Sequence, residues 1–321
     1  MIRWGMIGAG DVTEVKSGPA FNKVENSTLV ALVRRNADKA RDYASRHNVP
    51  DWYCDAASML CRDDINAVYI ATPPSTHKDY ALAALKAGKD IYIEKPMALN
   101  AVEGREILQT AETLGRKVCL AHYRRELPCF NKVKELIDAG SIGDIQYVTS
   151  EILQPEDSGI VAKTDEDWRT NPAISGGGLF HDLAPHQIDL MVYYFGSPVD
   201  LFGFASGRKP GVADLVSGQM KFQNGTVFHG VWCFTAPRTE ARDKCVLLGS
   251  RGKIEFSFYS GAHVVLSTEE TEKTYDFSNP ENIQLPLIDK VVKYFSGEGE
   301  NPCTGQDGVK VMEIIDKFSA S

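Results

Sequence analysis

Short apolar segments alternate with longer amphipathic segments over the first third of the chain. Three segments carry apolar residues at helical spacing: Ala37–His47, Ser75–Lys86 and Ala101–Leu114. Five apolar segments between and around them have the length and composition of buried β-strands: Ile2–Ile7, Thr28–Val33, Ala67–Ala71, Asp90–Glu94 and Lys117–Ala121. Buried strands that alternate with helices predict an α/β fold with a doubly wound parallel sheet.

The pattern changes after Tyr123, and from Ile145 onward most segments alternate with a period of two. The predicted strands are Gln146–Leu153, Val199–Ala205, Gln219–Phe222, Thr226–Phe234, Lys244–Leu248, Lys253–Phe258 and His263–Ser267. Asn224-Gly225 lies between two of them and is typical of a hairpin. The predicted helices are Lys132–Ala139, Gly178–Phe195, Ile283–Phe295 and Gly305–Phe318. These segments predict an α+β domain with a large, mostly antiparallel sheet, so we divide the chain into domains 1–122 and 123–321.

Composition limits the possible partners of the protein. The 321 residues suit two domains, and the net charge of −8 argues against a sequence-wide nucleic-acid-binding surface. No apolar run reaches the ~18 residues that cross a bilayer, and the chain begins without the features of a signal peptide. The seven cysteines are scattered and contain no C-x-x-C pair, which predicts reduced thiols in the cytoplasm and no zinc site.

A glycine turn follows the first predicted strand. Gly8, Ala9 and Gly10, continued by Asp11 and Val12, match the start of a dinucleotide-binding turn, in which glycines let backbone N–H groups approach a pyrophosphate. The third small position of that motif is occupied by Thr13 instead of glycine or alanine. Two glycines in a turn are weak evidence alone, but their place in the first βα unit favours a Rossmann domain that binds a dinucleotide.

The end of the second strand distinguishes the two nicotinamide cofactors. An acidic residue there binds the ribose hydroxyl of NAD, whereas this strand ends Val33-Arg34-Arg35. Arg34 and Arg35 offer two guanidinium groups to a 2′-phosphate. We therefore favour NADP(H) over NAD(H), although a solvated arginine pair would have the same sequence.

Two further segments carry residues suited to proton transfer. Lys95 follows a buried strand, where a partly desolvated lysine exchanges protons with a hydroxyl or carbonyl group, although most lysines are solvated surface residues. Asp182 and His186 recur at helical spacing with Asp189, and Pro185 interrupts the helix beside His186. Asp189 more readily suits a structural ion pair, and His181 lies on another helix face. A metal site formed by His181, Asp182 and His186 would have no known ligand spacing, so we predict no metal.

Four motifs resemble those of the Gfo/Idh/MocA oxidoreductase family, which includes glucose–fructose oxidoreductase and inositol dehydrogenase. They are the Gly8-x-Gly10 turn, Thr72-Pro73-Pro74-Ser75-Thr76-His77, Glu94-Lys95-Pro96, and the segment from Gly176-Gly177-Gly178 to Asp182-x-x-x-His186-x-x-Asp189. They occur in the same order as in the family, and the resemblance covers essentially the whole chain.

The resemblance implies specific roles. Lys95 would contact the reacting hydroxyl and the nicotinamide ribose, Pro96 would follow a cis peptide bond, His186 would be the acid/base, and Asp182 would contact the substrate. Residues implied in cofactor binding are Thr72, Pro73, His77, Glu94, Trp168 and Arg169, and those implied in substrate binding are Tyr123 and Arg124. His77 could instead have only a structural place at a helix start, and the Tyr123-Arg124 and Trp168-Arg169 pairs could be packing residues.

These observations predict an NADP(H)-dependent dehydrogenase or reductase that acts on a secondary alcohol or ketone of a sugar or cyclic polyol. Two alternatives remain open at this stage: a cofactor-binding regulator without turnover, and a glycosidase that oxidises and re-reduces its substrate on bound NAD. We also expect a homodimer or homotetramer, with no nucleic-acid or membrane partner.

Overall fold

The computed structural model describes residues 1–160 and 168–320, which form two compact units. The first unit contains Met1–Tyr123 and Pro280–Met312, and the second contains Arg124–Asn279 and the end of the chain from Glu313. The sequence-based division places everything after residue 122 in the second domain, whereas the contacts of Pro280–Met312 group this segment with the first unit. The periodicity of an amphipathic helix shows that one face is buried, but it does not show which sheet that face covers.

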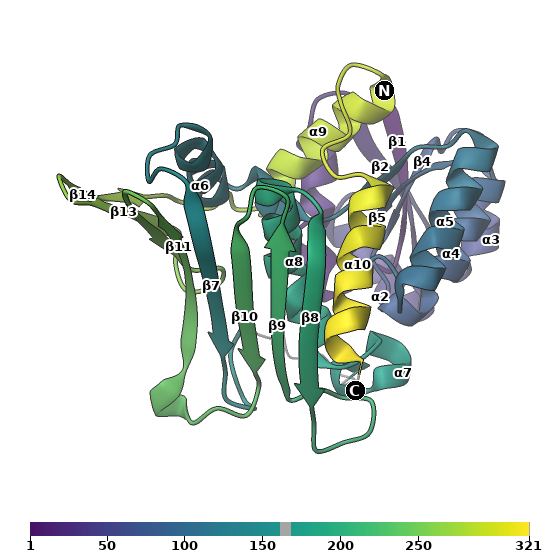
Figure 1. Cartoon of the computed structure of the whole chain (residues 1–321). Helices are drawn as coiled ribbons and strands as arrows, with labels where there is room; N and C mark the ends of the chain where they lie inside the picture. The colour runs from purple at the N-terminus through teal and green to yellow at the C-terminus, as the bar shows by residue number, and fades with distance from the viewer. Residues whose placement is uncertain (161–167, 321) are drawn as a thin grey trace. The chain divides into compact units, whose positions relative to one another are not determined.

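The first unit is built on a six-stranded parallel sheet with the strand order β3-β2-β1-β4-β5-β6 (Figure 1). The strands are β1 (Ile2–Ile7), β2 (Ser27–Val33), β3 (Asp51–Tyr53), β4 (Ala67–Ile70), β5 (Asp90–Ile93) and β6 (Val118–Leu120). This order confirms the predicted doubly wound sheet. The sequence analysis missed β3, which has only three residues, none of them buried.

The helices of this unit are α1 (Asp11–Val15), α2 (Ala37–Arg46), α3 (Ala56–Leu60), α4 (His77–Lys86), α5 (Ala101–Leu114), α9 (Leu285–Ser296) and most of α10 (Gly305–Ser319). Side chains of Asn36, Asp55 and Asn100 cap α2, α3 and α5. Two 3-10 turns, Gly18–Asn22 and Pro74–Thr76, complete the connections. The five-residue helices α1 and α3 are too short to show a helical period, which explains why they were missed.

The second unit contains an eight-stranded sheet with the order β14-β13-β12-β11-β7-β10-β9-β8. Its strands are β7 (Ile145–Leu153), β8 (Pro198–Ser206), β9 (Leu215–Phe222), β10 (Val227–Cys233), β11 (Arg242–Gly249), β12 (Gly252–Phe256), β13 (His263–Thr268) and β14 (Glu272–Asp276). All neighbours are antiparallel except β7 and β10. The predicted hairpin joins β9 to β10, and Gly225 has the positive φ of 88° that this turn requires.

Helices cover one face of this sheet: α8 (Leu179–Phe195) and the end of α10, with α6 (Pro128–Asp138) near β13 and the short α7 (Pro172–Ser175) before α8. Phe180 of α8 packs against Trp232 of β10, with 5.2 Å between ring centroids. Gly203 and Gly218 pair across β8 and β9 and make room for Phe318 of α10, because a Cβ on Gly218 would lie 2.3 Å from its ring.

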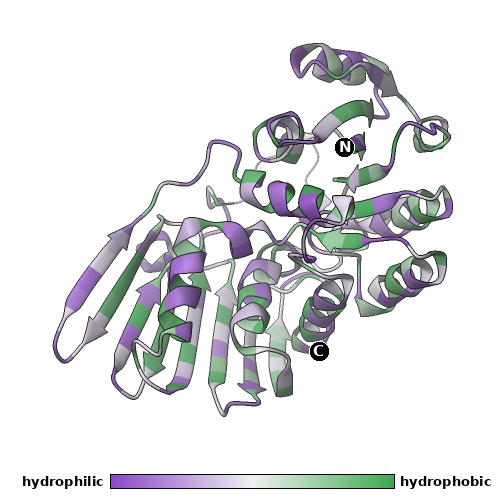
Figure 2. Ribbon diagram, turned by 90° about the horizontal axis from the view of Figure 1, so that it is seen from above, coloured by the Kyte–Doolittle hydropathy of each residue, from purple (hydrophilic) through white to green (hydrophobic). Residues whose placement is uncertain are grey.

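Among the described residues of the second unit, no helix covers the opposite face of this sheet, which we call the open face. Hydrophobic and hydrophilic residues alternate along its strands, as Figure 2 shows. Two aromatic residues of the edge strand β8 interrupt this alternation on the open face: Phe202 is 53% exposed and Phe204 is 67% exposed. The centroids of their two rings lie 4.6 Å apart.

No helix within residues 1–160 and 168–320 is long and apolar enough to span a membrane.

Candidate active site

The glycine turn after β1 lies at the carboxyl edge of the parallel sheet. The backbone N–H of Gly8 donates to the carbonyl of Val33 at 3.1 Å, which ties the turn to β2. Gly8 has a φ of 98°, and a Cβ there would lie 2.8 Å from the backbone of Thr72. A Cβ on Gly10 would meet only the Gly8 carbonyl, at 4.0 Å, so the turn leaves open space above Gly10. Glycine at both positions is what a closely approaching phosphate requires.

Thr13 explains how the turn tolerates a departure from the usual third glycine. Its side chain is fully buried, and its hydroxyl donates to the Gly10 carbonyl at 2.7 Å. The Tyr43 hydroxyl of α2 donates to the Thr13 carbonyl at 2.8 Å. Burial raises the pKa of Tyr43 to about 12, so this hydroxyl keeps its proton at neutral pH. Thr13 therefore stabilises the turn from its buried side and does not occupy the open space above Gly10.

The end of β2 presents positive charge. Arg34 is half-buried and Arg35 is exposed, and within the part of the chain that the structure describes neither forms an ion pair with a carboxylate. The neighbouring Asn36 accepts from the backbone N–H of Lys39 at 3.0 Å and so begins α2. The open glycine turn and these two guanidinium groups fit the phosphates of a dinucleotide.

His77 connects two of the predicted cofactor segments. It is fully buried, and its ring nitrogens lie 2.7 Å from the Thr72 carbonyl and 2.9 Å from the Pro96 carbonyl. Burial lowers the pKa of His77, which favours a neutral ring. Because the ring joins the segment after β4 to the segment after β5, its structural role is visible, and a direct contact with the cofactor stays a prediction. Pro73 lies half-buried beside Thr72.

Glu94 is a buried carboxylate held by neutral donors. It accepts hydrogen bonds from the Tyr69 hydroxyl at 2.7 Å, the Gln284 amide at 2.6 Å and the backbone N–H of Lys95 at 3.2 Å. Burial, and then the charge of Glu94, raise the pKa of Tyr69 and of Tyr92. These contacts hold the carboxylate inside the unit, and a direct contact of Glu94 with the cofactor stays a prediction. The Lys95 side chain is half-exposed at the end of β5, and the Lys95–Pro96 bond is cis, as the resemblance implied.

In the second unit, α8 carries Asp182 and His186 one turn apart. Asp182 accepts from Nε of Arg169 at 3.0 Å, and the Arg169 guanidinium lies 4.5 Å from the centre of the Trp168 ring. His186 is 4% exposed. The structure therefore brings Trp168 and Arg169 to Asp182, although the resemblance had separated them into cofactor and substrate contacts.

Asp189 has the structural role that the sequence favoured. It forms a buried ion pair with Arg125 at 2.7 Å, and the two side chains are 1% and 5% exposed. Arg124 is also buried: its Nη1 donates to the Phe258 carbonyl, and its guanidinium lies 4.6 Å from the centre of the Tyr259 ring. Tyr123, the last residue of the first unit, is 6% exposed. Substrate contacts by Tyr123 and Arg124 stay predictions.

Sequence reasoning missed two residues beside His186. Gln187 is fully buried, and Tyr259 lies in the loop after β12 with its ring 6.3 Å from the His186 ring. The Gln187 amide donates to the Tyr259 hydroxyl at 3.1 Å. A single tyrosine in a loop has no local motif, so only the fold shows this contact.

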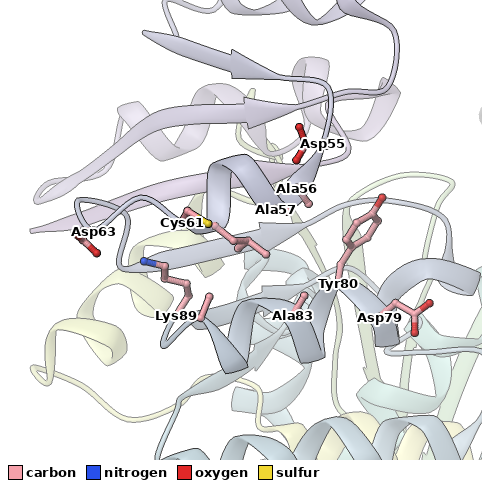
Figure 3. A pocket seen from close by; sticks show the side chains of 11 residues that line it. Asp55, Ala56, Ala57, Cys61, Asp63, Asp79, Tyr80, Ala83 and Lys89 are labelled. Atoms are coloured by element: carbon pink, nitrogen blue, oxygen red, sulfur yellow. The ribbon is translucent and has the colours of Figure 1, made fainter.

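A groove of about 810 Å³ lies elsewhere in the first unit, between α3 and α4 (Figure 3). Alanines and Leu60 form much of its lining, with Tyr80 and Asp79 near one end and Lys89 and Cys61 near the other. None of the predicted site residues lines it. Across residues 1–160 and 168–320, no group of three or more His, Cys, Asp or Glu side chains is arranged to hold a metal.

The doubly wound sheet and the glycine turn define a dinucleotide-binding domain of the Rossmann class. Residues 2–122 match the model of the oxidoreductase family with an NAD-binding Rossmann fold, and residues 130–255 match the GFO/IDH/MocA C-terminal domain. The chain therefore belongs to the Gfo/Idh/MocA family, as its motifs predicted, and it is an NAD(P)-dependent oxidoreductase.

Individual relatives cover nearly the whole chain. "Oxidoreductase P35" of Formosa agariphila is 47% identical over 317 residues, covering 99% of this chain and 98% of the relative. The 1,5-anhydro-D-fructose reductase of Ensifer adhaerens is 26% identical over 326 residues, with coverages of 96% and 92%. A solved levoglucosan dehydrogenase in complex with NADH and levoglucosan is 22% identical with a TM-score of 0.85, covering 99% of this chain and 96% of that one. The last similarity shows the shared fold.

His181 generates a prediction about stability. Its ring packs on Gly177, where a Cβ would lie 2.1 Å away, and burial lowers the pKa of His181 from 6.5 to about 4. The unfolded chain therefore binds a proton more readily than the folded protein between these pH values, so acidification from pH 6.5 to 4 removes up to about 3 kcal/mol of stability through this residue. His181→Leu should flatten this part of the pH profile of unfolding in urea.

The matched control is the exposed His263, whose replacement by leucine should leave the slope of the wild type. An unchanged slope in His181→Leu would contradict the assignment of a neutral, buried imidazole.

Proposed function

We propose that this protein is an NADP(H)-dependent dehydrogenase or reductase acting on one secondary alcohol or ketone of a sugar or cyclic polyol. The proposal rests on the glycine turn and Lys95, which lie at the same edge of the parallel sheet. The turn has open space for a phosphate, and the chain also has the helix that carries Asp182 and His186. Two of the proteins described above are named for cyclic, polyhydroxylated compounds, which supports this substrate class.

The chemistry divides between the cofactor and the protein. A bound nicotinamide supplies or accepts the hydride at the substrate carbon. In this proposal Lys95 and His186 handle the proton of the substrate hydroxyl: the proton leaves the oxygen when the alcohol is oxidised and returns when the ketone is reduced. Asp182, oriented by Arg169, accepts a hydrogen bond from a second hydroxyl of the substrate.

The proposed cofactor site comprises Gly8, Ala9, Gly10, Asp11, Val12, Arg34, Arg35, Thr72, Pro73, His77, Glu94, Lys95, Trp168 and Arg169. Tyr123 and Arg124 complete the proposed substrate site with Asp182 and His186. The preference for NADPH rests on Arg34 and Arg35, which have no carboxylate partner in the described chain and no acidic residue beside them at the end of β2. We also propose a cytoplasmic location, supported by seven scattered cysteines that contain no C-x-x-C pair.

We further propose a homodimer or homotetramer that uses the open face of the eight-stranded sheet. Phe202 and Phe204 form an exposed aromatic pair on this face, and aromatic residues are enriched in the cores of protein interfaces. Phe202→Ser with Phe204→Ser should convert the assembly to smaller species in sedimentation velocity, whereas Val102→Ser, a similarly exposed position on α5, should not. A wild-type protein that sediments as a monomer would contradict this proposal.

Cofactor choice gives a direct test. NADPH should bind at least tenfold more tightly than NADH, a difference of about 1.4 kcal/mol, because the arginines pair with the 2′-phosphate. Arg34→Asp should abolish or invert this preference in fluorescence titrations. Arg116→Asp, at the opposite edge of the sheet before β6, serves as the charge-matched control. Equal affinities of the wild type for both cofactors would overturn the assignment.

Loss of the proton-transfer groups should separate chemistry from binding. Lys95→Met should lower kcat by roughly 10²-fold while the protein still binds cofactor, and His186→Ala should act similarly. The double variant should lose far less than the product of the two effects, because both groups serve one proton path. Wild-type turnover by Lys95→Met would remove the lysine from the mechanism.

The substrate class is tested by a panel of aldoses, inositols, anhydro-ketoses and aliphatic alcohols, with NADP⁺ or NADPH and nicotinamide absorbance as the readout. We expect turnover of at least one cyclic polyhydroxylated compound and little turnover of aliphatic alcohols, since the buried polar groups of the proposed site need several hydroxyl partners. Cofactor binding without turnover of any sugar would favour a regulator instead.

A further inference from the structure

We propose that Tyr259 is a positioning residue that holds α8 across Pro185 and thereby fixes His186 relative to Asp182. The inference rests on the proposed role of His186 as the acid/base. It concerns residues of the second unit alone, and no sequence motif marks Tyr259.

Pro185 weakens α8 at the point where geometry matters most. The helix runs without interruption from Leu179 to Phe195, yet Pro185 has no N–H to donate to the carbonyl of His181. Its ring also crowds the preceding turn, and such positions bend helices. Asp182 precedes the proline and His186 follows it, so the spacing of this pair depends on the one turn that lacks its usual hydrogen bond.

Tyr259 bridges this turn from outside the helix. Its hydroxyl donates to the carbonyl of Leu183 at 3.1 Å and accepts from the side-chain amide of Gln187 at 3.1 Å. Leu183 lies two residues before Pro185, and Gln187 lies two residues after it. One oxygen atom thus contacts the helix on both sides of Pro185.

The direction of each hydrogen bond is determined by chemistry. The indole N–H of Trp232 can only donate, and it donates to Oε1 of Gln187 at 3.1 Å. The amide nitrogen of Gln187 must then face Tyr259, and the single hydroxyl proton of Tyr259 is left for the Leu183 carbonyl. This series of hydrogen bonds gives the side-chain amide of the fully buried Gln187 both a donor and an acceptor partner, and it connects β10 to α8.

Tyr259 is itself held in place. The carboxylate of Asp243 accepts from the backbone N–H groups of Phe258, Tyr259 and Ser260 at 2.9, 2.6 and 2.7 Å. The buried guanidinium of Arg124 lies over the Tyr259 ring at 4.6 Å, a cation–π contact. The ring then lies beside His186, with planes inclined at 72°. A tyrosine fixed on several sides can transmit a fixed position to the helix.

The test uses Tyr259→Phe, which keeps the ring and its contacts with Arg124 and His186 but removes the hydroxyl. We expect kcat to fall about tenfold, less than the roughly 10²-fold that a ~1 Å misplacement of a catalytic group costs, because the Tyr259 ring stays in place. Cofactor affinity should remain within twofold of the wild type. The solvent isotope effect on kcat should rise, because proton transfer through a loosely held His186 becomes slower relative to hydride transfer. Tyr275→Phe, a tyrosine of β14, should match the wild type in all three measurements.

A smaller active fraction of enzyme would lower kcat and leave the solvent isotope effect unchanged. That result, or wild-type kcat in Tyr259→Phe, would overturn the inference. A second measurement uses Pro185→Ala, which returns an N–H to the helix. The loss caused by Tyr259→Phe should shrink to less than threefold in the Pro185→Ala background, and an equal loss in both backgrounds would also contradict the inference.

The failure of the proposed function is distinguishable from the failure of this inference. If His186→Ala retains full activity, the acid/base assignment is wrong. If His186→Ala loses activity while Tyr259→Phe keeps it, only the positioning role of Tyr259 is wrong.

Discussion

The first unit must supply hydrogen bonds to the buried carboxylate of Glu94. A desolvated charge costs several kcal/mol unless hydrogen bonds compensate for it. Here Tyr69 of β4, Gln284 of the returning C-terminal segment and the backbone of Lys95 supply those bonds. The same interaction therefore joins two strands to a distant segment and sets the backbone from which Lys95 projects.

A comparable requirement organises the second unit. Asp189, which pairs with Arg125, and the Gln187 amide are polar groups buried on α8, and each has a defined partner. Both lie within one turn after His186, so the helix cannot rotate there without leaving a buried polar group unsatisfied. In each unit, buried polar groups with hydrogen-bond partners thus lie next to a proposed catalytic side chain and fix the backbone that carries it. Proton transfer by pre-organised groups requires such fixed positions.

The sequence predicted those parts of the fold that have local signals. The limits of α5 and β1 agree with the predicted ranges, because a capping asparagine, a terminal glycine and a run of apolar residues are visible in the sequence. β3, α1 and α3 have too few residues for a period, and β14 is a mostly exposed edge strand without an apolar face. Membership of Pro280–Met312 in the first unit and the contacts of Tyr259 depend on long-range packing, which no local pattern encodes.

In the proposed reaction, hydride passes between a nicotinamide and a carbon of a cyclic polyol. Transfer of a heavy isotope from that carbon to the cofactor reports on this step alone. The wild type is incubated with NADP⁺ and a polyol substrate deuterated at its carbinol carbons, and the reduced cofactor is analysed by NMR. We expect deuterium at C4 of the nicotinamide, on one face of the ring. Hydrogen from solvent at that carbon, or bound cofactor that never acquires deuterium, would contradict it.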